Sequence, residues 1–212
     1  RFGGYTYHIT GDRSSRLEYA VFVQGEDELA RSICSLVAVS INNIKTLYDE
    51  KHDKATFVKN IILDNILPGD IYIKSRELHF GNDVPRVVFL IRQQEPADVA
   101  AIDVVTGMFP DKQKDFVLHI SESDIVVVKE VKAGSESKEL VKLASSIEET
   151  LMSELSVKCL IGIGSVSSQM KDIAKSFKEA TTAIEVGAVF DTEKNIISFE
   201  NLGIGRLIYQ LP

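Results

Sequence analysis

Two carboxylates stand in a short polar segment where they could hold a cation. Glu122 and Asp124 belong to Ser121-Glu122-Ser123-Asp124, between the apolar segments 116–120 and 125–131. Carboxylate oxygens are the ligands that Mg²⁺ and Ca²⁺ prefer. The same four residues also have the composition of a solvated hairpin turn. We favour the turn, so the sequence assigns neither a metal ligand nor a catalytic residue here.

The other residues with chemical potential are isolated from one another. Gly162-Ile163-Gly164-Ser165 lacks the Lys of a phosphate-binding loop and favours a strand end against which a helix packs closely. Glu179 lies near the inward side of its helix, and we interpret it as a structural cap or ion-pair partner. The histidines have no metal-ligand spacing; they are His8, His52, His79 and His119. The sequence therefore predicts no metal, no cofactor and no catalytic group.

Two cysteines, Cys34 and Cys159, lie far apart in apolar surroundings. Buried, reduced thiols are the expectation for a protein of the cytosol. A redox switch is the alternative.

Length and composition indicate one large domain or two small ones. The chain has 212 residues, of which 44% are hydrophobic. No apolar run approaches the roughly 20 residues of a membrane helix, and the first residues do not form a signal peptide. We expect a cytoplasmic protein without a membrane partner. Because the sequence has no initiator Met and starts in a strand, we also expect it to begin inside a longer protein.

The charge distribution argues against direct nucleic-acid binding. The net charge is −7; residues 1–80 carry 10 Lys+Arg against 11 Asp+Glu, and residues 81–212 carry 14 against 20. Phosphate contacts require a basic surface, which neither part offers.

The first part of the chain predicts a hairpin followed by a long helix. Segments 5–10 and 17–24 are rich in aromatic and β-branched residues and flank a polar turn at 11–16. A helix then opens at Gly25 with acids in its first turn, passes a polar break at 49–54, continuous or kinked, and reaches Leu67, where Pro68-Gly69 ends it. Its first apolar stripe comprises Leu29, Ile33, Leu36, Val37, Ile41, Ile44, Leu47 and Tyr48. Such a helix needs a neighbouring domain or a second copy of itself.

From residue 84 onward, strands and helices alternate. Strands are predicted at 84–91, 116–120, 125–131, 157–164 and 196–199. Helices are predicted at 70–80, 97–108 with Pro96 near its start, 140–155, 169–189 and 202–211. The order indicates an α+β fold with a βαββαβ core.

Four segments in this order together resemble one family. They are similar to segments of CdaR/PucR-type bacterial regulators, the sugar diacid regulator family. The four segments are 57–71; Val87–Ile91; Ile161–Ser165 with Ser176–Ala180 and Ala183; and Ile197–Gly203 followed by Leu207-Ile208. The resemblance covers about residues 26–212.

The resemblance implies a domain organisation. Residues 1–50 would be the C-terminal part of a PAS/GAF-like sensor, 51–80 a helical connector, and 81–212 a degenerate GGDEF/cyclase-like regulatory domain. A DNA-binding helix-turn-helix would follow Pro212. The effector would be a small molecule such as a sugar acid or diacid, although other members of the family respond to purine-pathway compounds.

The resemblance also implies what chemistry is lost. A GGDEF cyclase needs metal-binding carboxylates on its first strand and two glycines in its hairpin. Val87–Ile91 has no carboxylate, and Ser121–Ile125 has no glycine. We therefore expect no enzyme, but a sensing and dimerising regulator fragment that pairs as a homodimer through the 26–67 helix. The alternatives are a residual nucleotide-binding or cyclase-like module, and an interaction scaffold without a ligand.

The sequence leaves the ligand site of the sensor part open. An aromatic cluster could line a pocket or pack a core; it comprises Phe2, Tyr5, Tyr7, Tyr19 and Phe22. Arg13 and Arg16 could meet an anionic effector, or lie solvated on the surface. We assign no binding residue to this part.

Overall fold

The computed structural model describes residues 3–11, 17–81, 83–94, 98–190 and 194–203. The chain divides into two compact units between His52 and Asp53. Three sequence-based expectations fall outside the described residues: most of the turn at 11–16, Pro96, and most of the final helix at 202–211.

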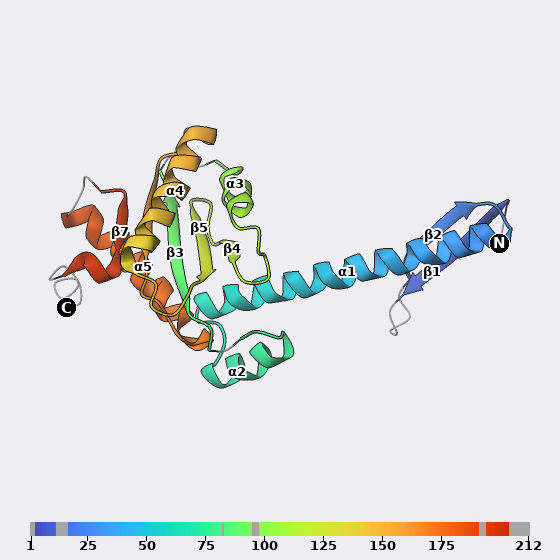
Figure 1. Cartoon of the computed structure of the whole chain (residues 1–212), viewed down its shortest axis with the longest axis horizontal. Coiled ribbons are helices and arrows are strands. Elements are labelled where there is room, and N and C mark those ends of the chain that lie inside the picture. The colour runs from blue at the N-terminus through green and yellow to red at the C-terminus, as the bar shows by residue number, and fades with distance from the viewer. Residues whose placement is uncertain (1–2, 12–16, 82, 95–97, 191–193, 204–212) are drawn as a thin grey trace. The chain divides into compact units, whose positions relative to one another are not determined.

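The first unit contains the predicted hairpin. Strands β1 (Tyr5–Gly11) and β2 (Leu17–Gln24) pair antiparallel, with Tyr5 opposite Gln24 and Ile9 opposite Ala20 (Figure 1). One face of the hairpin lies on the N-terminal part of α1 (Glu28–Ile62), where the thiol of Cys34 lies 3.4 Å from the carbonyl oxygen of Val21. The core of this unit is small: among the described side chains of α1 up to His52, the buried ones are Ala30, Cys34 and Ala38.

Helix α1 begins with a capping interaction and passes the polar segment at 49–54 without interruption. The Oδ1 atom of Asp27 accepts a hydrogen bond from the backbone N–H of Ala30 at 2.7 Å. This bond satisfies one of the amides that a helix start leaves free. The segment 49–54 contains neither Gly nor Pro, so nothing in it breaks the helix. The boundary between the two units falls within this helix.

The predicted end of the long helix at Leu67 is wrong. Helix α1 ends at Ile62, and Asp64 adopts a left-handed conformation with φ 60°. Pro68 opens helix α2 (Pro68–Glu77), with Leu67 as its N-cap residue. Proline lacks the N–H that an interior helical residue donates, but the first helical turn has no need of it. Pro68 therefore cannot lie in the interior of a continuing helix, but it is compatible with the first turn of a new one.

The second unit is built on a five-stranded sheet. Its strands are β3 (Arg86–Gln93), β4 (Phe116–His119), β5 (Asp124–Glu130), β6 (Cys159–Ile163) and β7 (Ile196–Ser198). Their order is β4-β5-β3-β6-β7, and β6 and β7 form the parallel pair while the other neighbours are antiparallel. This arrangement confirms the predicted α+β fold with its preceding hairpin and long helix.

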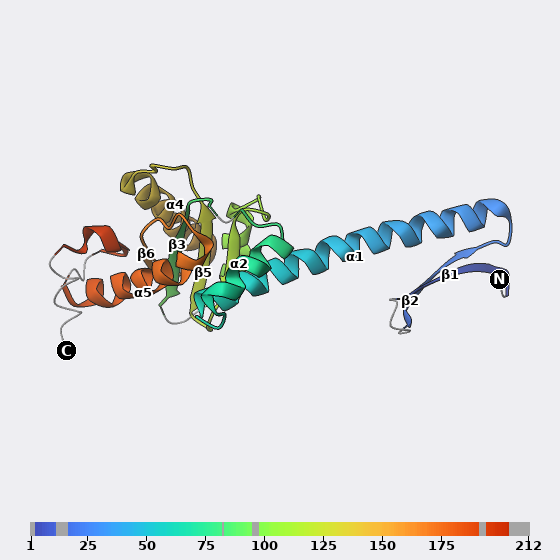
Figure 2. The ribbon, with the colours of Figure 1, turned by 90° about the horizontal axis from the view of Figure 1, so that it is seen from below.

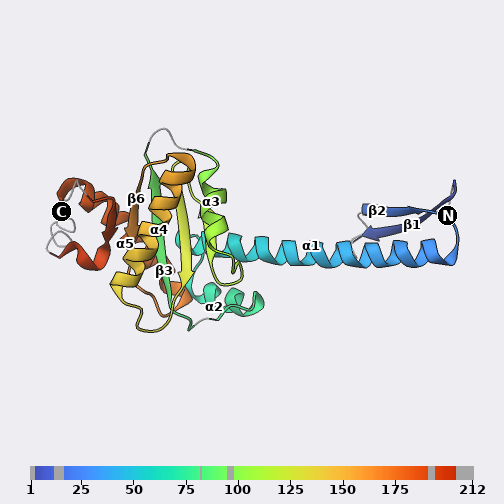
Figure 3. The ribbon, with the colours of Figure 1, turned by 45° about the horizontal axis from the view of Figure 1, so that its top comes forward.

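Helices cover both faces of this sheet (Figures 2 and 3). Helices α3 (Ala101–Met108) and α4 (Ser137–Leu155) pack on one face. The last turns of α1 and helix α5 (Ile173–Phe190), which follows the short 3₁₀ helix η1 (Met170–Asp172), pack on the other. A second 3₁₀ helix, η2 (Phe199–Leu202), follows β7. Helix α3 begins later than predicted, because Asp98 accepts the N–H of Ala100 in a preceding turn.

The alternation of side chains along β3 separates two hydrophobic cores. Val88 and Leu90 face α5 and the end of α1, whereas Phe89 and Ile91 face α3 and α4. The last turns of α1 contribute four buried residues to the first of these cores: Phe57, Val58, Ile61 and Ile62. The end of α1 is therefore an integral part of the second unit.

Within the described residues, no helix has both the length and the apolar character needed to cross a membrane.

Candidate functional site

The hairpin between β4 and β5 holds one of the two candidate carboxylates in an ion pair. Arg92, near the end of β3, donates from Nε to Oδ1 of Asp124 at 2.9 Å and from Nη2 to Oδ2 at 3.0 Å. The two residues face each other in the register of β3 and β5. The hydrogen bond to Asp124 raises the pKa of Arg92, and burial opposes this effect. The carboxylate of Asp124 already has a cation as its partner.

Hydrogen bonds fix the turn that contains Glu122. The N–H of Asp124 donates to Oγ of Ser121 at 3.1 Å, and the N–H of Gln93 donates to the carbonyl of Ser123 at 2.8 Å. Glu122 itself is exposed. The structure does not bring the two predicted carboxylates together as a pair of ligands: one points to solvent and the other binds Arg92.

Sequence reasoning missed Arg92. The signal available was a single charge at the end of the apolar segment 87–91. Its meaning depended on strand register, since only the pairing of β3 with β5 places Arg92 opposite Asp124. Register between strands that are distant in sequence is set by the folded sheet.

The glycine motif at the end of β6 is a close-packing device, as the sequence predicted. A Cβ atom on Gly162 would lie 2.1 Å from the carbonyl oxygen of Ala180, and one on Gly164 would lie 2.1 Å from that of Ser176. These distances are shorter than any real contact, so only glycine lets α5 approach the strand. No room remains for a phosphate between the strand and the helix.

Two polar side chains of α5 secure this contact. The hydroxyl of Ser176 donates to the carbonyl of Ser165 at 2.8 Å and accepts from the N–H of Val88 at 3.2 Å. Glu179 accepts from the N–H of Ser165 at 2.9 Å and lies 3.9 Å from Nζ of Lys175. Glu179 thus has the structural role that we expected.

The histidines are exposed and dispersed over different elements; they are His8, His52, His79 and His119. Among the residues that the structure describes, no three His, Cys, Asp or Glu side chains gather in a way that could hold a metal ion.

Both cysteines are free and buried, as predicted. Burial, with a smaller contribution from the charge of Glu148, raises the pKa of Cys159 to about 12. Cys34 contacts the carbonyl oxygens of Thr6 and Val21 in the hairpin. The Cys159 thiol is therefore protonated near neutral pH, which is the unreactive form.

Three aromatic residues of the predicted cluster gather on the outer face of the hairpin. Phe22 packs edge-on against Tyr5 at 5.9 Å and lies 6.0 Å from Tyr7, measured between ring centroids. Phe22 is 63% exposed, so this face is not a core within the described residues. Phe2, Arg13 and Arg16, and the side chain of Tyr19, lie outside the described part.

Helix α1 carries the predicted apolar stripe on a surface that the hairpin leaves exposed. Leu36 is 69% exposed and Ile44 is 67% exposed, whereas Ala30, Cys34 and Ala38 are buried under the hairpin. We refer to this surface as the apolar face of α1; it comprises Leu29, Ile33, Leu36, Val37, Ile41, Ile44 and Leu47. The side chain of Tyr48 is not among those described.

Comparison with known families gives one match. A family model described as a GGDEF-like domain matches residues 65–186, which is more than half of the chain. The match begins before α2 and ends within α5, so it includes both the β4–β5 hairpin and the glycine motif. A comparison with curated proteins gives no match.

Proposed function

The chain belongs to the GGDEF-like domain family, and from this premise we propose that it is the sensing and coupling part of a cytoplasmic CdaR/PucR-type transcription regulator. In this proposal the hairpin unit senses a small effector such as a sugar acid or diacid. Helix α1 transmits the conformational change caused by effector binding to the GGDEF-like domain. A DNA-binding domain elsewhere in the longer protein responds to this change. The chain itself contacts no DNA.

The observation that carries the proposal is the exposed apolar face of α1. The seven residues of this face are large, apolar and exposed along one helix, a pattern that marks a surface for association. Their spacing of three and four residues suits the seam between two helices. A second copy of the chain offers the same face, so two copies can bury it symmetrically. We therefore propose that the regulator is a homodimer paired through α1.

We further propose that the GGDEF-like domain has no cyclase activity. The side chains of β3 from Val87 to Ile91 are apolar and buried, so the strand offers no carboxylate to a metal. Arg92 pairs with Asp124 at the strand end, and the hairpin lacks the glycines that let a nucleotide approach the backbone. A fixed positive charge in this position opposes the binding of a divalent cation.

Sedimentation equilibrium tests the pairing. The unchanged chain should be a dimer at micromolar concentration. Leu36→Glu combined with Ile44→Glu should give a monomer, because four charges would enter the seam of a dimer. Thr46→Glu is the matched control: it adds a charge to the same helix on its polar side, and it should leave the dimer intact. If the unchanged chain is a monomer, the proposed pairing through the apolar face of α1 is contradicted.

A thermal-shift screen tests the sensing role and separates the alternatives. Small diacids, glycerate, sugar acids and purine metabolites would be added to the longer regulator. A ligand that binds the folded state alone stabilises it by RT ln(1 + [L]/Kd), about 2.7 kcal/mol at a hundredfold excess over Kd. A shift with one chemical class supports the regulator. A shift with GTP and Mg²⁺ alone supports a residual nucleotide-binding module, and no shift supports an interaction scaffold.

A further inference from the structure

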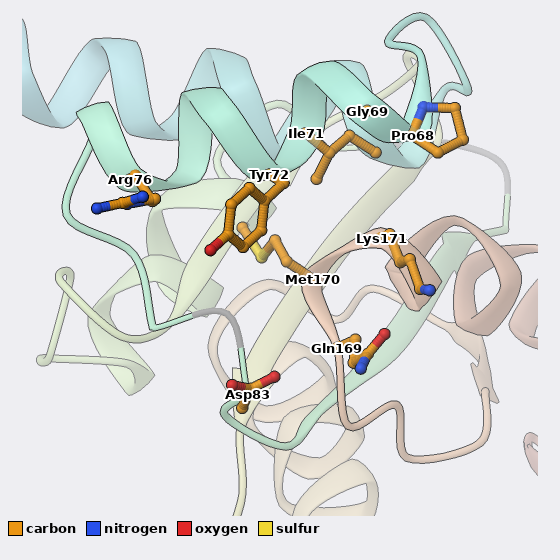
Figure 4. Close-up of a pocket in the computed structure, with 9 residues that line it drawn as sticks. All are labelled: Pro68, Gly69, Ile71, Tyr72, Arg76, Asp83, Gln169, Met170 and Lys171. Carbon is orange, nitrogen blue, oxygen red and sulfur yellow. The ribbon is translucent and has the colours of Figure 1, made fainter.

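A cavity of about 670 Å³ lies in the second unit between α2 and the residues that lead into α5 (Figure 4). Its volume is within the range of small-molecule sites, roughly 300–1,000 Å³. It is separate from the β4–β5 hairpin: Asp83, which lines it, precedes β3, whereas Arg92 and Asp124 stand at the other end of that strand.

The floor of the cavity is apolar. Ile71 of α2 and Met170 of η1 line it and are buried, and Pro68 continues the apolar surface at one end. Tyr72 is 58% exposed, and Figure 4 shows its ring next to Met170, with the hydroxyl on the side away from Lys171. An apolar or planar group could therefore lie against Ile71, Met170 and the ring of Tyr72.

Two cations stand at the margin of this floor. In the view of Figure 4, Tyr72 and Met170 lie between Arg76 of α2 and Lys171 of η1. Within the part of the chain that the structure describes, neither Arg76 nor Lys171 forms an ion pair. Neighbouring lysines do: Lys175 pairs with Glu179, and Lys178 pairs with Asp64. A bound anion could therefore interact with both side chains without displacing an ion-pair partner.

The remaining polar groups set the orientation of a ligand. Asp83 and Gln169 line the side of the cavity away from Tyr72 in Figure 4. A carboxylate on the ligand would be repelled by Asp83 and attracted to Arg76 and Lys171, so it would lie at the end of the cavity away from Asp83. A hydroxyl or amine at the other end of the ligand could donate to Asp83.

We propose that this cavity binds a small organic anion with an apolar or aromatic body and a hydrogen-bond donor. Arg76 and Lys171 attract the anionic group from opposite margins of the floor, Ile71, Met170 and Tyr72 contact the body, and Asp83 accepts a hydrogen bond from the donor group. The ligand would bridge α2 and η1, two elements from opposite ends of the matched region. This site is additional to the sensor of the proposed regulator, and the proposal does not depend on that function.

The test uses 4-hydroxyphenylacetate as the probe, because it combines a carboxylate, an aromatic ring and a phenolic donor. The whole chain would be titrated and followed by ¹H–¹⁵N NMR. Saturable shifts are expected for amides in 69–76 and 169–171. The neutral analogue 4-hydroxyphenylacetamide should bind about threefold to tenfold more weakly, since it loses the charge interaction with exposed cations.

Matched variants locate the interaction. Arg76→Met and Lys171→Met remove the charges while keeping long side chains, and each should weaken the probe by about threefold to tenfold. Lys175→Met, one turn beyond η1 and outside the cavity lining, should not change its affinity. Thermal unfolding checks that each variant is folded. Three results would overturn the proposal: no saturable shift, shifts confined to other residues, or equal affinities of the acid and the amide.

Discussion

Arg92 and Asp124 bind each other through two hydrogen bonds across neighbouring antiparallel strands, at 2.9 Å and 3.0 Å. The geometry is that of the planar guanidinium and carboxylate in their most favourable arrangement. Both side chains are partly accessible, at 34% for Arg92 and 16% for Asp124, so water screens the pair to some extent.

A double-mutant cycle measures this interaction. We expect Arg92→Ala and Asp124→Ala each to lower the free energy of unfolding by about 1–2 kcal/mol, with a coupling energy of about 1 kcal/mol. Urea unfolding of the four proteins gives both numbers. The pair Lys114 and Asp111, which is more exposed and 3.4 Å apart, is the control and should show weaker coupling. Additive effects at Arg92 and Asp124 would contradict the geometry.

Alanine at either glycine of the β6 motif should be strongly destabilising. The new Cβ would meet the carbonyl oxygen of Ala180 or Ser176 at 2.1 Å, and backbone cannot move aside without disturbing α5. We expect Gly162→Ala and Gly164→Ala each to lower the free energy of unfolding by about 3 kcal/mol or more.

Gly107 provides the matched control for this prediction. It lies in α3, and nothing is within 4 Å of a Cβ built on it. Because alanine is the better helix former, Gly107→Ala should raise the free energy of unfolding by about 0.5–1 kcal/mol. Equal effects at the three positions would mean that β6 and α5 are not in close contact.

Phe80 should be essential to the attachment of the α1 end to the sheet. Its ring lies 5.7 Å from that of Phe57 in α1 and 5.4 Å from that of Phe116 in β4. Lys54 and Arg86 also stand over it, at 5.8 Å and 5.9 Å. We expect Phe80→Ala to cost about 3–5 kcal/mol, measured by urea unfolding.

Leu67 is the control for Phe80, since it is an apolar residue from the same region that is 72% exposed. Leu67→Ala should change the free energy of unfolding by less than about 0.5 kcal/mol. A small effect of Phe80→Ala would show that the last turns of α1 are held by other contacts.

The two cysteines should differ in their rates of labelling. Both are buried, but Cys34 is covered by a two-stranded hairpin, whereas Cys159 lies in the five-stranded sheet. Small elements open more readily than a central sheet. Native Cys34 should therefore react with a thiol reagent faster than Cys159, which mass spectrometry of Cys34→Ser and Cys159→Ser variants can resolve. Equal rates would contradict this order.

The raised pKa of Cys159 also predicts a dependence of stability on pH. In the unfolded chain the thiol ionises near about 8.5, whereas in the folded protein burial raises its pKa to about 12. The protonated thiol's favourable contribution to the free energy of unfolding is complete below about pH 8.5, and it is lost as the pH rises towards the pKa of the folded protein. The difference in free energy of unfolding between the unchanged chain and Cys159→Ala should fall over this interval. A difference that stays constant with pH would contradict the burial effect.

Much of the fold could be predicted because the relevant signals are local. Apolar segments rich in β-branched residues predicted the strands of the sheet, and period-3.6 stripes predicted α4, α5 and the two halves of α1. The glycines at 162 and 164 indicated a close approach of helix and strand, which the structure confirms. The end of α1 was misplaced because Pro68 is compatible with both the end of one helix and the start of the next.

The sequence by itself determined the residue types: an apolar β3 without carboxylates, a hairpin without glycines, and a helix with an apolar stripe on either side of a polar segment. Tertiary structure decided which residues meet. Register placed Arg92 opposite Asp124, and chain folding brought Arg76 and Lys171, 95 positions apart, to one cavity. It also left the apolar face of α1 exposed while burying Ala30, Cys34 and Ala38. Local propensity acts over a few residues, whereas these contacts arise from burial and strand pairing between distant segments, which no local pattern encodes.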